Sequence, residues 1–263
     1  MVKQCNIVMI GAGNMATRLS IALADAGHNI LQVYSRTLRS AKLLAEELGT
    51  NTLYTDNIEE IITEAHLYIF SISDQALSDV IAHMPSCSGM WVHTAGSMPM
   101  DIFDAYTQRY GVMYPMQTVS KERTIDWSQV PIFIEASNVE DITMLEEVAR
   151  SISQQVTQCN SQQRQALHLA AVFACNFTNH MYAIAEQLLR KQGINFDAMK
   201  LLIRETELKA ENFSPGQVQT GPAVRCDYNV MNKHLALLGD SPESELYRLI
   251  SNNIIEYAKH EIL

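Results

Sequence analysis

Short apolar runs recur along the first 158 residues, and stretches with helical spacing separate them. Each run is too short for a helix and rich in residues that favour strands. The predicted strands are 5–10, 29–34, 52–54, 67–70, 90–92, 111–114, 131–135 and 155–158. The predicted helices between them are 15–26, 38–48, 58–62, 74–81 and 138–151. This alternation predicts right-handed crossovers and a doubly wound, mostly parallel sheet.

The pattern changes near Asn160, after which no run predicts a strand. Only helical patterns separated by turn signals follow, at about 162–191, 195–212 and 220–238, with a last helix starting at Pro242. We therefore predict an α/β domain over residues 1–158 and an all-α domain over residues 159–263.

The first of these late helices is the longest, and it is apolar almost all round between Leu167 and Met181. Such a helix is buried on several sides. A domain of about 100 residues has little chain with which to cover it. We therefore expect a homodimer formed through the helical domain, because symmetric dimers are the commonest way to cover such a surface.

A glycine-rich turn joins the first predicted strand to the first predicted helix. Gly11 suits a tight turn, Gly13 lets the backbone approach a pyrophosphate, and Ala16 suits close packing of helix on strand. The N–H groups at the helix start, including those of Asn14 and Met15, would point at the anion. The turn predicts a dinucleotide site in a Rossmann domain, although such turns also occur for packing alone.

The end of the second strand distinguishes the two nicotinamide dinucleotides. In NAD sites an acidic residue at the end of this strand binds the ribose, whereas the 2′-phosphate of NADP needs cationic and hydroxyl groups. Here the strand runs into Ser35, Arg36 and Thr37, with no acid. The guanidinium group suits phosphate, so NADP is the predicted cofactor. Thr37 can at the same time cap the following helix.

Three further loops follow predicted strands directly, at residues 71–74, 93–97 and 114–118. Ligands of doubly wound sheets bind at the carboxyl ends of the strands. We therefore place Ser71, Ser73, His93 and Ala95 in the cofactor site. His93 has two open roles, contact with the nicotinamide or substrate and bracing of its own loop.

Composition and charge narrow the class of protein. The 263 residues are 47% hydrophobic and 18% charged, as expected of a globular protein, and the net charge of −10 argues against nucleic acid or an anionic membrane as partner. There is no run of eighteen apolar residues and no signal-peptide pattern, so we expect a cytoplasmic protein. The five cysteines show no CxxC spacing, and neither disulfides nor a metal site is predicted.

Several motifs together resemble a family of NADP oxidoreductases with a Rossmann domain and a helical domain of unassigned function. Besides the glycine turn and Ser35-Arg36-Thr37, the resemblance covers these segments: 93–97 (HTAGS), 114–118 (YPMQT), 168–176 (HLAAVFACN) and 220–227 (TGPAVRCD). The wider superfamily includes pyrroline-5-carboxylate reductase and the deazaflavin-dependent NADP oxidoreductases. The resemblance implies the fold and the cofactor strongly, and leaves the substrate open.

The chain differs from two relatives at informative positions. Pyrroline-5-carboxylate reductases carry a Ser/Thr-Pro-Gly-Gly-Thr-like segment where this chain has Thr220-Gly221-Pro222-Ala223, which argues against proline synthesis. Enzymes of the β-hydroxyacid dehydrogenase type use a Lys four residues before an Asn, and here Val172 stands four before Asn176.

Three residues are candidate catalytic groups. His168 titrates near neutrality and can relay a proton, and Asn176, eight residues later, can share a broad helix face with it. Arg225, after a Thr-Gly-Pro turn, can bind a carboxylate or phosphate group. The alternatives are a hydrogen-bonded core histidine and an internal pair of Arg225 with Asp227.

Three functions follow. The favoured one is an NADP(H)-dependent oxidoreductase that acts on a small imine, carbonyl or deazaflavin-like acceptor. The second is a non-catalytic NADP-binding module, and the third is a 3-hydroxyacid dehydrogenase, which Val172 disfavours.

Overall fold

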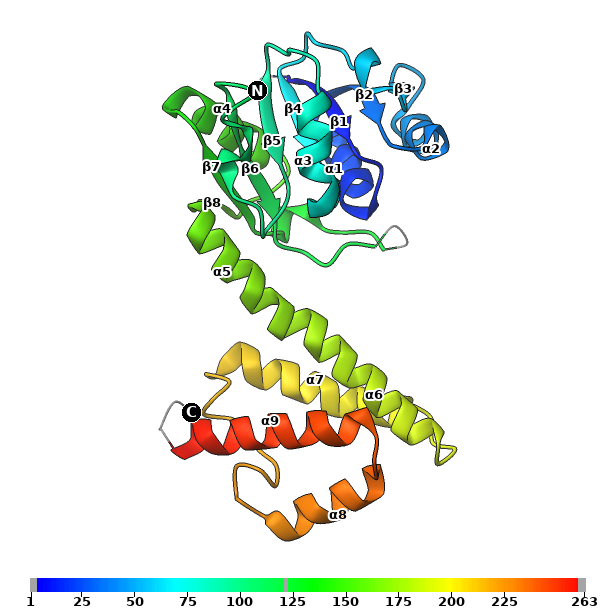
Figure 1. Ribbon diagram of the computed structural model, residues 1–263, viewed down its shortest axis with the longest axis vertical. Helices are drawn as coiled ribbons and strands as arrows, with labels where there is room; N and C mark the ends of the chain where they lie inside the picture. The colour runs from blue at the N-terminus through cyan, green and yellow to red at the C-terminus, as the bar shows by residue number, and fades with distance from the viewer. Residues whose placement is uncertain (1–3, 121–122, 260–263) are drawn as a thin grey trace. The chain divides into compact units, whose positions relative to one another are not determined.

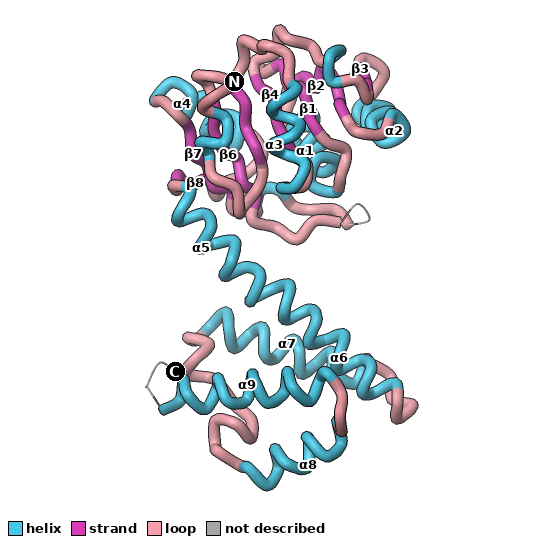
Figure 2. The backbone as a smooth tube through the Cα atoms, viewed as in Figure 1, coloured by secondary structure: helices cyan, strands magenta, loops and turns pink. Residues whose placement is uncertain are grey.

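The computed structural model describes residues 4–120 and 123–259. The chain folds into two compact units, divided between Asn176 and Phe177. The first unit contains all the strands and the second contains helices and turns alone, over the residues described (Figure 2). An α/β Rossmann domain followed by an all-α part is thus confirmed.

Eight strands of the first unit form one sheet (Figure 1) in the order β3-β2-β1-β4-β5-β6-β7-β8. Their bounds are β1 (Asn6–Ile10), β2 (Asn29–Tyr34), β3 (Leu53–Thr55), β4 (Leu67–Phe70), β5 (Met90–His93), β6 (Tyr110–Pro115), β7 (Ile132–Ala136) and β8 (Val156–Gln158). All neighbours pair in parallel except β6 and β7, which are antiparallel. Each lies within about two residues of its predicted range.

Four helices cover the two faces of the sheet, namely α1 (Asn14–Asp25), α2 (Leu38–Leu48), α3 (Asp74–His83) and α4 (Val139–Arg150). A further helix, α5 (Ser161–Ala171), follows β8. Shorter 3₁₀ turns are η1 (Ile58–Glu60), η2 (Met100–Phe103) and η3 (Trp127–Gln129). The helix predicted over 58–62 is therefore a single 3₁₀ turn, in which Asn57 accepts a hydrogen bond from the Glu59 N–H.

Two hydrophobic cores lie on the two sides of the sheet, because alternate residues of a strand point to opposite faces. Ile7 and Met9 of β1 pack with α1, α2 and α4, whereas Val8 and Ile10 pack with α3 and Phe103. With both faces covered, β1 and β4 are buried almost throughout. This burial explains their continuous apolar sequences.

The long helical pattern predicted over 162–191 is continuous but not uniform. After α5 comes a π-helical segment, η4 (Val172–Phe177), and then α6 (Thr178–Arg190). A π turn contains more residues than an α turn. The face relation predicted for His168 and Asn176 on an ideal α-helix therefore does not apply.

The second unit continues with α7 (Asp197–Asn212), α8 (Tyr228–Leu238) and α9 (Pro242–Lys259). The predicted helix start at Thr220 is wrong, because α8 begins only at Tyr228. Gly221 has φ +114° and Cys226 has φ +52°, neither of which is helical. The Asp227 side chain then caps α8 by accepting a hydrogen bond from the Val230 N–H at 3.2 Å.

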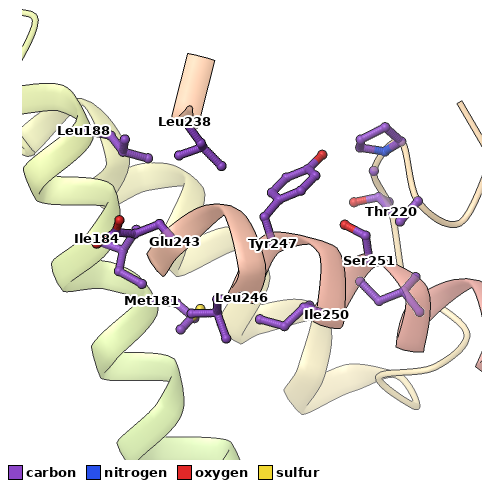
Figure 3. Close-up of a pocket in the computed structure, with 14 residues that line it drawn as sticks. Met181, Ile184, Leu188, Thr220, Leu238, Glu243, Leu246, Tyr247, Ile250 and Ser251 are labelled. Atoms are coloured by element: carbon purple, nitrogen blue, oxygen red, sulfur yellow. The ribbon is translucent and has the colours of Figure 1, made fainter. Parts of the chain in front are cut away.

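An apolar cavity of about 310 Å³ lies within the second unit (Figure 3). Leu246 and Ile250 of α9 line it together with Met181 and Ile184 of α6. The hydroxyl of Tyr247, also in its wall, bonds His234 Nδ1 at 2.9 Å. This cavity contains none of the residues predicted for the cofactor.

The predicted domain boundary between residues 158 and 159 coincides with the end of β8 and stays a prediction. In the described residues, no helix combines the length and the hydropathy that a membrane span requires.

Candidate active site

The glycine turn lies at the carboxyl end of β1. Gly11 has φ +122° and donates its N–H to the Tyr34 carbonyl oxygen at 2.8 Å. A Cβ atom at this position would collide with the Ser71 carbonyl oxygen. Glycine is therefore required twice, for the backbone angle and for the close approach of the two strand ends.

The start of α1 offers backbone donors. Gly13 is the N-cap, no side chain caps the helix and its first turn has no acidic residue. A Cβ at Gly13 would meet no atom within 4 Å, so the approach to these N–H groups is open. Helix N-termini of this kind bind phosphate groups. Ala16 is fully buried, which fits its predicted packing role.

The side chain of Asn14 makes a different contact. Its Nδ2 donates to the Val119 carbonyl oxygen at 3.1 Å, which holds the loop after β6 against the glycine turn. Asn14 and Met15 both line the cavity, so the turn is closed on one side by this loop.

Hydroxyl groups and one cation gather at the end of β2. Arg36 and Thr37 are exposed, and the Thr37 hydroxyl donates to Ser40 Oγ at 2.8 Å. Thr37 is the N-cap of α2, as predicted, but it makes no capping hydrogen bond with the backbone. Arg36, Thr37 and Ser40 all line the same cavity, and a guanidinium group together with hydroxyl groups suits a phosphate.

The ends of β4 and β5 are joined by side chains. Thr94 Oγ1 donates to Ser71 Oγ at 3.2 Å, and the Ser97 hydroxyl donates to the Asp74 carboxylate. Ser73 is the N-cap of α3. These bonds keep the two loops together at one wall of the cavity.

His93 lies inside the sheet unit with a fully buried side chain. Its Nδ1 accepts a hydrogen bond from the Ala95 N–H at 3.2 Å, and its Nε2 lies 3.3 Å from the Pro99 carbonyl oxygen. Burial, and then the nearby Arg164 charge, lower its pKa to about 3 against a smaller opposing effect of the Pro99 hydrogen bond. Of its two predicted roles, this geometry fits bracing of the loop rather than contact with the cofactor.

A tyrosine and a histidine meet at the inner wall. The hydroxyl oxygen of Tyr114, at the end of β6, lies 3.2 Å from His168 Nδ1 on α5. Tyr114 is buried and His168 is half-buried, and both line the cavity. A Cβ at Gly96 would lie 2.7 Å from His168 Cγ and Nδ1, so the imidazole ring packs directly on this glycine.

The cavity that these elements enclose has a volume of about 770 Å³. The predicted residues in its wall are Gly11, Gly13, Asn14, Met15, Ser35, Arg36, Thr37, Ser71, Ser73, Ala95 and His168. Ala16 and His93 lie outside the wall. The backbone donors, the cation and the hydroxyl groups fit a dinucleotide with a phosphorylated ribose.

The other two catalytic candidates, Asn176 and Arg225, belong to different units of the chain. Asn176 is exposed at the end of the first unit, and it does not line the cavity. Arg225 is exposed in the second unit and has no described ion pair with Asp227, whose carboxylate caps α8.

The sequence did not identify several residues of the wall. Asp74, Thr94 and Tyr114 line the cavity and belong to the loops predicted at the ligand-binding edge, but they were not assigned to the site. Ser40 also lines the cavity and was not predicted there. Tyr114 was recognisable as the last side chain before Pro115 at a strand end. Its partner His168, however, follows 54 residues later in the chain, and local sequence patterns do not predict contacts between residues so far apart.

Two family models match parts of the chain. The Shikimate / quinate 5-dehydrogenase model matches residues 1–87, and a model described as a domain of unknown function, DUF2520, matches residues 130–254. No curated protein matches the chain.

Among solved structures, the putative NADP oxidoreductase BF3122 from Bacteroides fragilis is 45% identical, with a TM-score of 0.89. The match covers 97% of this chain and 100% of that one. The chain belongs to this family of NADP oxidoreductases. Membership confirms the resemblance found in the sequence, the class of enzyme and NADP as the cofactor.

Two more distant structures share the family fold. A reductive aminase from Aspergillus terreus in complex with NADPH and ethyl-5-oxohexanoate has 16% identity and a TM-score of 0.76 over 98% of this chain and 95% of its own. A pyrroline-5-carboxylate reductase from Coxiella burnetii has 17% identity and a TM-score of 0.58 over 98% of both chains.

The buried His93 predicts a specific pH dependence of stability. Its pKa is about 3 in the folded state and about 6.5 unfolded, so between these values only the unfolded state binds the proton. The free energy of unfolding should therefore fall as the pH falls below about 6.5, by up to roughly 1.4 kcal/mol per pH unit.

This dependence can be measured by urea unfolding between pH 4 and pH 8 in the native protein and in His93→Gln. Below about pH 6 the dependence of the free energy of unfolding on pH should be smaller in the variant by about one proton, and above about pH 7 the two proteins should have the same slope. Equal slopes in the two proteins below about pH 6 would contradict the assignment of His93 as a neutral, buried group.

Proposed function

We propose that this protein is an NADPH-dependent reductase. Its hydride acceptor is a small imine, a carbonyl compound or a deazaflavin-like molecule. The observation that supports the proposal is the pair of Tyr114 and His168. It lies in the wall of the same cavity as the glycine turn and Arg36. A proton donor is thus available beside the predicted dinucleotide site.

Reduction of a C=O or C=N bond requires a hydride on carbon and a proton on oxygen or nitrogen. When bound, the reduced nicotinamide supplies the hydride. We assign the proton to the Tyr114 hydroxyl, with His168 Nδ1 at 3.2 Å as the group that holds and replaces it. Burial raises the pKa of Tyr114, so the phenol is protonated at neutral pH.

The remaining residues have binding roles in this proposal. The backbone of residues 11–16 holds the pyrophosphate, and Ser35, Arg36, Thr37 and Ser40 hold the 2′-phosphate. Asn176 and Arg225 stay predictions as catalytic residues, Arg225 as a group that can bind a carboxylate or phosphate of the substrate.

Removal of either proton-handling group tests the proposal. General acid catalysis contributes about 10²–10⁴-fold, so Tyr114→Phe and His168→Asn should each lower kcat by roughly 100-fold while NADPH binding persists. Activity is measured as NADPH consumption over a panel of imines, keto acids, ketones and flavins.

The control is Tyr106→Phe, which changes an exposed tyrosine outside the cavity wall. Values of kcat within threefold of the native enzyme for both site variants would contradict the assignment. Tight NADPH binding with no turnover of any panel member would instead favour the non-catalytic NADP-binding module.

The cofactor preference depends on Arg36. Hydrogen bonds to a charged group are worth about 1.5–3 kcal/mol, so Arg36→Ala should weaken NADPH binding by roughly 10- to 100-fold and leave NADH binding unchanged. Arg39→Ala is the matched control, because Arg39 is exposed on α2 and lies outside the cavity wall. Isothermal titration calorimetry measures the six dissociation constants of the native protein and the two variants for NADPH and NADH. Equal losses for the two cofactors would refute the 2′-phosphate role.

We also propose a homodimer formed through the helical domain. Within the second unit α7 exposes large apolar side chains, with 81% of Leu201 and 61% of Leu202 accessible. A second copy of the chain would cover them. Absence of a nucleic-acid partner and a cytoplasmic location likewise stay predictions from the sequence.

Sedimentation velocity over a hundredfold range of concentration tests the dimer. Leu201→Glu should raise the dimer dissociation constant by roughly tenfold or more, since it places a charge in an apolar interface. Leu43→Glu on α2, which is 57% exposed in the first unit, should leave it unchanged. A native protein that sediments as a monomer at every concentration would disprove the proposal.

A further inference from the structure

The N-terminal half of α5 runs antiparallel to the loop that follows β5, and hydrogen bonds connect the two segments at several positions. Ser161 Oγ accepts from the Met100 N–H at 3.0 Å, and Gln165 Nε2 donates to the Ser97 carbonyl oxygen at 3.0 Å. The last contact is that of the His168 ring with Gly96. The position of His168 therefore depends on how α5 is held to this loop.

Arg164 makes the central contact of this set. Its Nη2 donates to the Met98 carbonyl oxygen at 2.7 Å and to Ser161 Oγ at 3.1 Å, and its Nη1 donates to Glu135 Oε2 at 2.6 Å. The Arg164 side chain is only 1% exposed and that of Glu135 17%. One guanidinium thus connects α5, the loop after β5 and the end of β7.

Glu135 completes the network from the sheet. Its Oε1 accepts from the Ser161 N–H at 3.0 Å, and its Oε2 accepts from the Ser161 hydroxyl at 2.8 Å. The first turn of α5 is therefore fixed by charge-assisted hydrogen bonds, which are shorter and stronger than neutral ones.

Stability alone is a weak reason for such a network. Buried ion pairs are often no more stabilising than apolar side chains of similar volume. Arg164 Nε is also buried without a hydrogen-bond partner in the part of the chain described. The guanidinium instead provides a fixed geometry, because its planar group of N–H donors orients Glu135 and the Met98 carbonyl at the same time.

Arg164 lies four residues before His168, so both project from one side of α5. Both side chains contact the same short loop, since Arg164 bonds the Met98 carbonyl oxygen and the His168 ring packs on Gly96. We propose that Arg164 is a positioning residue that holds the His168 ring against Gly96 and within hydrogen-bond distance of Tyr114. This inference rests on the proposed function, in which that pair supplies the proton.

The charge of Arg164 acts on the same group. It lowers the pKa of Tyr114, which opposes the larger increase caused by burial. Loss of Arg164 is therefore expected to change both the geometry of the pair and the pH at which Tyr114 titrates.

The experiment compares Arg164→Gln, Arg164→Lys and the control Arg109→Gln in the full chain. Arg109 pairs with the buried Asp141 in the same unit but lies outside the cavity wall, so it reports general destabilisation. Two NMR readouts need no activity: the NOE between Gly96 Hα and the His168 ring, and the titration of ¹³C-labelled tyrosine, assigned with Tyr114→Phe.

In Arg164→Gln the NOE should weaken and the Tyr114 titration should move to higher pH, while Arg109→Gln leaves both unchanged. Misplacement by about 1 Å costs roughly 100-fold, so kcat should fall by 10- to 100-fold with little change in KM for NADPH. Arg164→Lys keeps the charge without the fork, so it should restore the titration and recover kcat only in part.

A folded Arg164→Gln with the native NOE, the native Tyr114 titration and kcat within twofold would overturn the proposal. If Arg164→Gln does not fold, Arg164→Lys decides, since an unchanged NOE and unchanged kcat in that variant would also overturn it. A native enzyme inert towards the whole panel would refute the proposed function. The NOE and the titration would still test the positioning role.

Discussion

The close passage of the Gly11 backbone against the Ser71 carbonyl oxygen is the contact on which the site depends. It brings the ends of β1 and β4 together so tightly that no side chain fits between them. The first turn of α1 then faces the cavity with its backbone donors uncapped. Because the strands are parallel, the ends of β2 and β5 open onto the same edge and complete the site.

The opposite wall is built by a different interaction. Arg164 and Glu135 form a buried ion pair that holds α5 to the sheet and to the loop after β5. His168 is carried by that helix and Tyr114 by the sheet, so their 3.2 Å contact joins the two. The part of the cavity proposed for the cofactor combines the backbone donors of the glycine turn with the side chains at the end of β2, whereas the part proposed for the chemistry is a pair of side chains.

The comparisons identify the family and the cofactor and leave the roles of the site residues as proposals. The match to the Bacteroides fragilis protein covers nearly the whole chain, and it fixes family and cofactor. The helical part, in contrast, falls in a domain whose description gives no function. The buried His93 forms hydrogen bonds with Ala95 and Pro99, and this geometry fits a bracing role in its own loop rather than contact with the cofactor.

By itself, the sequence determined the order of strands and helices, the glycine turn and the segment Ser35-Arg36-Thr37 at the end of β2, which it predicts to bind phosphate. These features depend on periodicity and on neighbours a few residues apart, which local patterns report. Only the tertiary structure decided that His93 is buried, that α8 starts at Tyr228 and that Tyr114 meets His168. Each of these depends on burial, on backbone angles or on contacts between distant segments, and such interactions leave no periodic signal in a single chain.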